Sequence, residues 1–164
     1  MLRSDILQYV YAGLFTAAWV FGLYEIEVID SGEAGLSALN VSLAASTLFL
    51  LGIVLLLGPL SRLFNRFDWA LKYRKELGIM SFFTGLAHVY LVMFPLARNG
   101  PWGLYTSRPL SAYPGLEALI VLFILFAISN RFATRVMGAK LWWQIQYWGA
   151  RAAFALIAFH MVVL

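Results

Sequence analysis

The sequence predicts an all-α integral membrane bundle of five transmembrane helices, with a cytoplasmic N-terminus and a periplasmic C-terminus. Of the 164 residues, 62% are hydrophobic and only 12% are charged, about half of the ~25% that is usual in soluble domains. The mean hydropathy is +0.80, so a soluble domain of this length would have too few polar side chains to cover its apolar ones. Long apolar segments separated by charged connections are typical of a chain that crosses a membrane repeatedly.

Five apolar segments are long enough to cross a hydrocarbon layer of about 30 Å at 1.5 Å per helical residue. They lie at residues 6–26, 38–60, 76–96, 115–130 and 141–163. The first is not expected to be a cleavable signal peptide, because its apolar run is too long and no small-residue cleavage site follows it. We expect the five helices to form a single domain over residues 1–164.

The basic residues of the connections predict the orientation of the helices. Nine lie on one side of the predicted bundle: Arg3, Arg62, Arg66, Lys72, Arg74, Lys75, Arg131, Arg135 and Lys140. The other side has two, with five acidic residues beside them: Arg98, Arg108, Glu25, Glu27, Asp30, Glu33 and Glu117. By the positive-inside rule, the side with nine basic residues is cytoplasmic.

The connection over residues 97–114 is the longest on the predicted outer side. It is rich in glycine and proline and contains Trp102, Tyr105 and Tyr113. Since these aromatic side chains favour the membrane–water interface, we expect an ordered loop that lies on the outer face.

The composition limits the possible cofactors and partners. The chain has no cysteine, which excludes disulfides, thiolate metal sites and cysteine-ligated iron–sulfur clusters. The formal net charge of +4 is explained by basic loops facing the cytoplasm and anionic lipid. We therefore expect membrane lipid as a partner, and no nucleic acid.

The two histidines are the strongest candidates for cofactor ligands. His88 is 13 residues after Lys75 and His160 is 17 residues after Trp143, which corresponds to about 20 Å and about 25 Å along helices that run in the same direction. Both are therefore predicted to lie in the outer half of the membrane at similar depth. Two imidazoles placed in this way could hold one haem b, with one axial nitrogen from each helix.

Further residues could support such a haem. Gly85 and Ala153 lie on roughly the same helix faces as the two histidines, where small side chains would let a porphyrin approach. Arg98 and Arg108 are the candidate partners for the haem propionates at the outer surface. The alternative is that each histidine is a lone polar residue that bonds to a neighbouring helix.

Three polar residues interrupt the last apolar segment. Arg151 could contact a quinone or another subunit, but the interpretation we favour is that it snorkels or pairs with a backbone group. Gln144 and Gln146 lie in the inner half of the same segment. Gln146 could line an inner pocket, although such residues more often bond one helix to another.

Several short motifs resemble those of ferric reductase-like transmembrane domains. The third segment reads Arg74-Lys-Glu-Leu-Gly-Ile79, followed by His88 and Tyr90. Within the family, the closest similarity is to the haem-binding membrane subunit of the bacterial periplasmic methionine-sulfoxide reductase system. Three weaker motifs resemble that branch: Leu57-Gly-Pro-Leu60, Ser107-Arg-Pro109 and Ala127-Ile-Ser-Asn130. The resemblance covers residues 45–164.

The resemblance implies a haem b between the third and fifth helices, with His88 and His160 as the iron ligands. It also implies electron transfer from a cytoplasmic-side or quinol donor to an acceptor outside. One departure is Gln146, which stands where the family usually has a first histidine in the fifth helix. We therefore expect one haem rather than two, and neither a sixth helix nor a flavin or nicotinamide domain.

Three functions are compatible with the sequence. The favoured one is an electron-transfer subunit of an oxidoreductase complex in the bacterial inner membrane, linking the quinone pool or a membrane partner to a periplasmic redox protein. The second is a self-contained membrane reductase that reduces ferric iron or oxidises quinol. The third is a haem-free anchor or assembly subunit, in which the histidines only hold helices together.

Overall fold

The computed structural model describes residues 3–97 and 103–163. All five predicted segments are helical, and no strand occurs in the described ranges, which confirms the all-α class. The helices form two compact units, Met1–Arg98 and Asn99–Leu164. The single domain expected over residues 1–164 stays a prediction.

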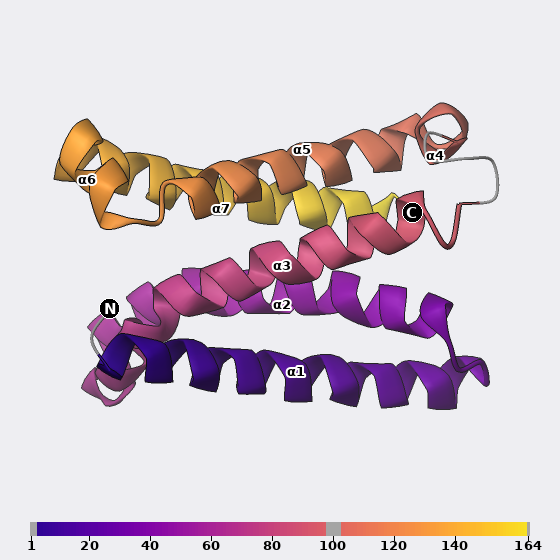
Figure 1. Ribbon diagram of the computed structural model, residues 1–164, viewed down its shortest axis with the longest axis horizontal. Coiled ribbons are helices and arrows are strands. Elements are labelled where there is room, and N and C mark those ends of the chain that lie inside the picture. The colour runs from indigo at the N-terminus through magenta and orange to yellow at the C-terminus, as the bar shows by residue number, and fades with distance from the viewer. Residues whose placement is uncertain (1–2, 98–102, 164) are drawn as a thin grey trace. The chain divides into compact units, whose positions relative to one another are not determined.

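The first unit contains three long helices and one short helix. These are α1 (Arg3–Ser31), α2 (Leu36–Leu63), the 3-10 helix η1 (Asn65–Tyr73) and α3 (Arg74–Met93). Within this unit α2 runs opposite to α1 and α3 and packs against both (Figure 1). The basic connection between the second and third segments is thus helical rather than an open loop, since η1 packs against α2 and leads directly into α3.

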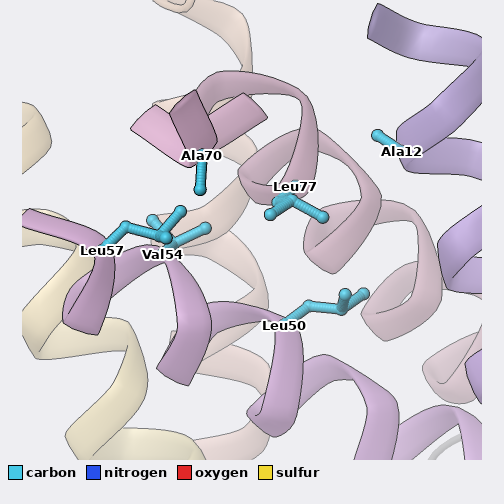
Figure 2. Close-up of a cluster of buried hydrophobic side chains, with 6 residues drawn as sticks. All are labelled: Ala12, Leu50, Val54, Leu57, Ala70 and Leu77. Atoms are coloured by element: carbon cyan, nitrogen blue, oxygen red, sulfur yellow. The ribbon is translucent and has the colours of Figure 1, made fainter. Parts of the chain in front are cut away.

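An apolar cluster holds the elements of the first unit together. Leu50, Val54 and Leu57 form a stripe along α2 at the spacing of one helix face. Figure 2 shows this stripe with Ala12 of α1 and Leu77 of α3. Ala70 brings η1 into the same cluster, so the short helix is fixed against α2.

A seam of hydroxyl side chains joins α2 to α3. Ser81 Oγ donates a hydrogen bond to the Thr47 carbonyl at 3.0 Å, and Thr47 Oγ1 donates to Thr84 Oγ1 at 3.0 Å. Ser42 and Ser46 are also buried along this part of α2. Small side chains let two helices approach closely, and their hydroxyls hydrogen-bond without leaving polar groups in an apolar medium. The seam therefore fixes the register of α3 against α2.

The second unit is an antiparallel helix pair with two short helices. It contains α4 (Gly103–Ser107), α5 (Pro109–Ala127), α6 (Arg131–Met137) and α7 (Ala139–Val162). Figure 1 shows α5 and α7 side by side, with α6 at the end where α5 stops and α7 begins. Asn130 caps α6 by accepting a hydrogen bond from the Ala133 amide at 2.9 Å.

The prediction of a loop over residues 97–114 is wrong for the residues of this range that the structure describes. Residues 103–107 form α4, and α5 begins at Pro109 rather than at residue 115. Pro109 occupies the first position of the helix, where its missing N–H costs no hydrogen bond and its fixed φ suits a helix start. Pro114 lies inside α5 and does not end it. Trp102 lies outside the described residues.

Four helical segments of the described chain are long and apolar enough to cross a membrane: Ile6–Ser31, Leu36–Leu63, Asn65–Met93 and Pro109–Ala127. The chain is therefore a multi-pass membrane protein. The 24-residue α7 is about 36 Å long, but its glutamines and Arg151 make it more polar than the other four. The fifth crossing and the orientation of the termini stay predictions.

The packing of α2 predicts that its buried leucines contribute more to the free energy of unfolding than its exposed leucines do. Leu50 is 0% exposed and Leu56 is 58% exposed. We expect Leu50→Ala to lower the free energy of unfolding by about 2 kcal/mol, the low end of the range for buried leucines, because lipid is as apolar as the site that is lost. Titration with SDS in mixed micelles measures the change. Equal effects of Leu50→Ala and Leu56→Ala would contradict the assignment of the core.

Candidate functional site

His160 lies in the last turn of α7 and is held by the start of α5. Its Nδ1 is 2.6 Å from the Ser111 carbonyl oxygen. A carbonyl only accepts hydrogen bonds, so the ring must donate through an Nδ1–H. Gly115, one turn further along α5, lies directly beside the same corner of the ring.

His88 lies in α3 and is held in a similar way within the first unit. Its Nδ1 is 3.2 Å from the Asn40 carbonyl oxygen, near the start of α2. Here too the acceptor is a backbone carbonyl, so the imidazole donates its Nδ1–H. The two units thus present the same arrangement, in which a histidine bonds to an early turn of the neighbouring antiparallel helix.

These hydrogen bonds determine which ring nitrogen can bind a metal. A neutral imidazole with its proton on Nδ1 carries its lone pair on Nε2, on the other side of the ring. Histidines that ligate metals nearly always donate their other N–H to a carbonyl, a carboxylate or water, which fixes the tautomer and raises the basicity of the ligand. Both histidines therefore have the tautomer and the kind of hydrogen-bond acceptor, a backbone carbonyl, that axial ligands of a haem iron have.

Both histidines lie at the helix ends that are remote from the basic connections. In the first unit, Asn40 is in the second turn of α2, just after the acidic Glu33. In the second unit, Ser111 is in the first turn of α5, at the opposite end from α6 with its Arg131 and Arg135. The predicted depth of the two histidines in the membrane stays a prediction. The facing of the two rings across a porphyrin stays a prediction.

Of the two arginines expected to bind the haem propionates, the structure describes only Arg108. Arg108 is the N-cap residue of α5, three residues before Ser111, and its side chain is exposed. It therefore lies at the same end of the second unit as His160. Arg98 lies outside the described residues. Their role as propionate partners stays a prediction.

The family of the chain is shown by comparison with known families. Residues 42–158 match the family described as "Ferric reductase like transmembrane component", a match that covers more than half of the chain. The chain belongs to the ferric reductase-like transmembrane family. The matched range includes α3 and α5 and most of α2 and α7, but His160 lies just beyond its end.

Two motifs of this ferric reductase-like chain meet in the first unit. A Cβ built on Gly58 of α2 would lie 3.7 Å from Nη1 of Arg74, the first residue of α3. The guanidinium therefore lies over this turn of α2, at a distance that would be an ordinary van der Waals contact for a Cβ. This contact gives the Leu57–Leu60 and Arg74–Ile79 motifs a shared structural role.

Gln146 acts as a clasp between α7 and the end of α5. Its Nε2 donates to the Leu125 carbonyl and to Ser129 Oγ, each at 3.1 Å. Nearby, Trp142 Nε1 donates to the Ile128 carbonyl at 2.8 Å. The helix-bonding interpretation of Gln146 is thereby supported, and Trp142 has a bonding role beyond that of an interfacial aromatic residue.

Arg151 is satisfied within its own helix. Its Nη1 donates to the Tyr147 carbonyl at 2.9 Å, and its guanidinium carbon lies 3.4 Å from the centroid of the Tyr147 ring. This cation–π contact and hydrogen bond confirm the favoured interpretation, in which the charge pairs with a backbone group. Gln144 is exposed on the surface of the second unit.

The two small residues expected to face a porphyrin, Gly85 and Ala153, are both buried within their units. Ala153 is 0% exposed and lies four residues after Gly149, whose Cα faces Leu125 of α5. It therefore lies on the side of α7 that packs against α5. Gly85 is buried in α3. A role for either residue in porphyrin approach stays a prediction.

Sequence reasoning did not identify Asn40, Ser111 and Gly115 as partners of the histidines. Asn40 and Ser111 act through backbone carbonyls, for which the residue type gives no signal. Gly115 falls at the predicted start of the fourth segment, where the sequence does not show which side chain a glycine contacts. The Ser107–Pro109 motif was the available signal, because a proline in the first position of a helix places Ser111 and Gly115 on its first two turns.

The clasp predicts a stability difference between the two glutamines of α7. Gln146→Ala removes two interhelical hydrogen bonds, whereas Gln144→Ala changes an exposed side chain. We expect Gln146→Ala to lower the free energy of unfolding by about 1 kcal/mol, in the range of polar contacts between membrane helices. The same SDS titration measures it. A loss as large for Gln144→Ala would contradict the clasp.

Proposed function

We propose that this protein is a haem b-binding electron-transfer subunit of a membrane oxidoreductase complex, with His88 and His160 as the two axial ligands. The observation that carries the proposal is that both imidazoles donate Nδ1–H to a backbone carbonyl. A haem iron held by two such rings supplies reversible one-electron transfer between its ferric and ferrous states. Membership of the ferric reductase-like family supports a redox role.

The chain itself fixes the tautomer and the orientation of the two proposed ligands. Two helix-bound imidazoles need no rearrangement of tautomer to present Nε2 to iron. Both rings are half-buried, and a low dielectric constant around an iron ligand is one factor that sets a redox potential. Among the described residues, no group of three His, Asp or Glu side chains is placed to hold a metal ion, whereas a haem needs only two protein ligands.

We further propose that electrons are exchanged at the outer face of a bacterial inner membrane. The charge pattern predicts that the helix ends bearing His88 and His160 face the periplasm. Arg108, exposed at the start of α5, and Arg98 would then pair with the propionates. An extracytoplasmic redox protein is the expected partner, as in the periplasmic methionine-sulfoxide reductase system that the sequence resembles.

Electrons would need a carrier other than this haem to cross the inner half of the membrane. The side chain of Gln146 is engaged with the Leu125 carbonyl and with Ser129, and an amide is a poorer iron ligand than an imidazole. One haem near one face does not cross a hydrocarbon layer of about 30 Å. We therefore propose that the electron donor is a quinol that reaches the outer half, or a cofactor of a partner subunit.

The same two hydrogen bonds are also compatible with a haem-free role. A histidine that only joins two helices also donates to a neighbouring backbone, as His88 and His160 do. A haem-free anchor or assembly subunit would use Nδ1 alone, whereas a haem ligand also uses Nε2. A self-contained reductase would bind haem as well, and turnover of a ferric chelate by the isolated chain would distinguish it from a subunit.

Visible spectroscopy of the purified protein tests the proposal. We expect sharp α and β bands in the reduced-minus-oxidised spectrum of protein from haem-replete cells, because two imidazoles make the iron low-spin. His88→Ala and His160→Ala should each remove these bands, since each takes away one axial ligand. Gln146→Ala is the matched control and should leave the haem content per chain unchanged.

Two outcomes would count against the proposal. A colourless wild-type preparation from haem-replete cells would favour the haem-free alternative. A loss of about half of the haem in Gln146→Ala would mean that this residue belongs to a second haem site, and that the ligand set is larger than two histidines.

A further inference from the structure

The His160 ring is packed tightly against a residue that has no side chain. A Cβ built on Gly115 would lie 3.0 Å from Nδ1, 3.1 Å from Cε1 and 3.4 Å from Cγ of the imidazole. These separations are shorter than normal van der Waals contacts between carbon and such atoms. Any larger residue at position 115 would therefore push the ring away from α5 by a few tenths of an ångström.

The atom nearest to Gly115 is also the atom that makes the hydrogen bond. Nδ1 of His160 is 2.6 Å from the Ser111 carbonyl oxygen, at the short end of the range for N–H···O bonds. Ser111 and Gly115 are one turn apart and lie on the same face of α5. The close approach of the ring to Gly115 and the short bond to Ser111 are therefore two parts of one contact.

We infer that Gly115 is a positioning residue for His160: the absence of its Cβ allows the short Nδ1–H bond that sets the rotation of this imidazole. The inference deepens the proposed function, because the ring so positioned is a proposed haem ligand. It concerns a contact that also exists without haem, so it can be tested separately.

The two histidines differ in the strength of this bond. The Nδ1 distance is 2.6 Å for His160 and 3.2 Å for His88. A shorter bond places more negative charge on the imidazole and makes Nε2 a stronger donor. His160 is therefore the more strongly hydrogen-bonded ring of the pair, and it would be the more electron-donating ligand of a bound haem iron.

The first experiment uses Gly115→Ala in the haem-loaded protein. We expect the midpoint potential of the haem to shift to more positive values and the low-spin EPR g-values of the oxidised protein to change, since a displaced ring loses its short hydrogen bond and donates less electron density to the iron. Ser111→Ala should leave both unchanged, because the acceptor is the backbone carbonyl. Wild-type potential and g-values in Gly115→Ala would overturn the inference.

Gly149→Ala is the matched control for helix packing. A Cβ there would lie 2.7 Å from Leu125 Cδ2, so this variant disturbs the α5–α7 pair far from His160. We expect it to lower stability with little change in potential. A shift in potential as large as that of Gly115→Ala would show that general loosening of the pair, and not the ring contact, controls the haem.

The second experiment needs neither haem nor a stable variant. NMR of wild-type protein labelled with ¹⁵N-histidine and prepared without haem should show both rings as Nδ1–H tautomers. The Nδ1 proton of His160 should lie further downfield than that of His88, because its bond is shorter. An Nε2–H tautomer at His160, or equal proton shifts, would overturn the inference even if the protein also binds no haem.

Discussion

In each unit of this protein, a histidine on one long helix donates its Nδ1 hydrogen to a backbone carbonyl in the first turns of the helix beside it. The acceptor is part of the helix itself, so the ring orientation is fixed by how the two helices pack and not by a side chain that could rotate. The same bond decides the tautomer and leaves the lone pair on Nε2. The proposed role of both histidines as iron ligands depends on this constraint.

Helix packing brings each histidine to its carbonyl. In the first unit, the hydroxyl seam of Thr47, Ser81 and Thr84 fixes the register of α3 against α2. In the second unit, Gln146 bonds α7 to the end of α5, and Gly149 lets Leu125 approach α7. The two pairs reach the same result with different contacts: hydroxyl groups in one, and an amide clasp with a glycine contact in the other.

Apolar length alone predicted the helical segments well, because a membrane helix must satisfy its backbone internally and shows this as a long hydrophobic run. The charge pattern did not predict the secondary structure of the basic connections between the long helices. These connections contain η1 and α6, and helices this short leave little periodicity in the sequence. The start of α5 at Pro109 is not evident from the sequence, because glycine and proline are typical of loops and proline is also common at the first position of a helix. The roles of Arg151 and Gln146 were predictable from the cost of an unpaired polar group in lipid, whereas the backbone acceptors of His88 and His160 were not.

We propose that both imidazoles bind one iron through Nε2. Pulsed EPR of the oxidised, haem-loaded protein carrying histidine labelled with ¹⁵N only at Nε2 tests this most directly. We expect a low-spin ferric signal with two strongly coupled ¹⁵N nuclei, one from each histidine. A single coupled ¹⁵N, or a high-spin signal with an open axial position, would contradict it.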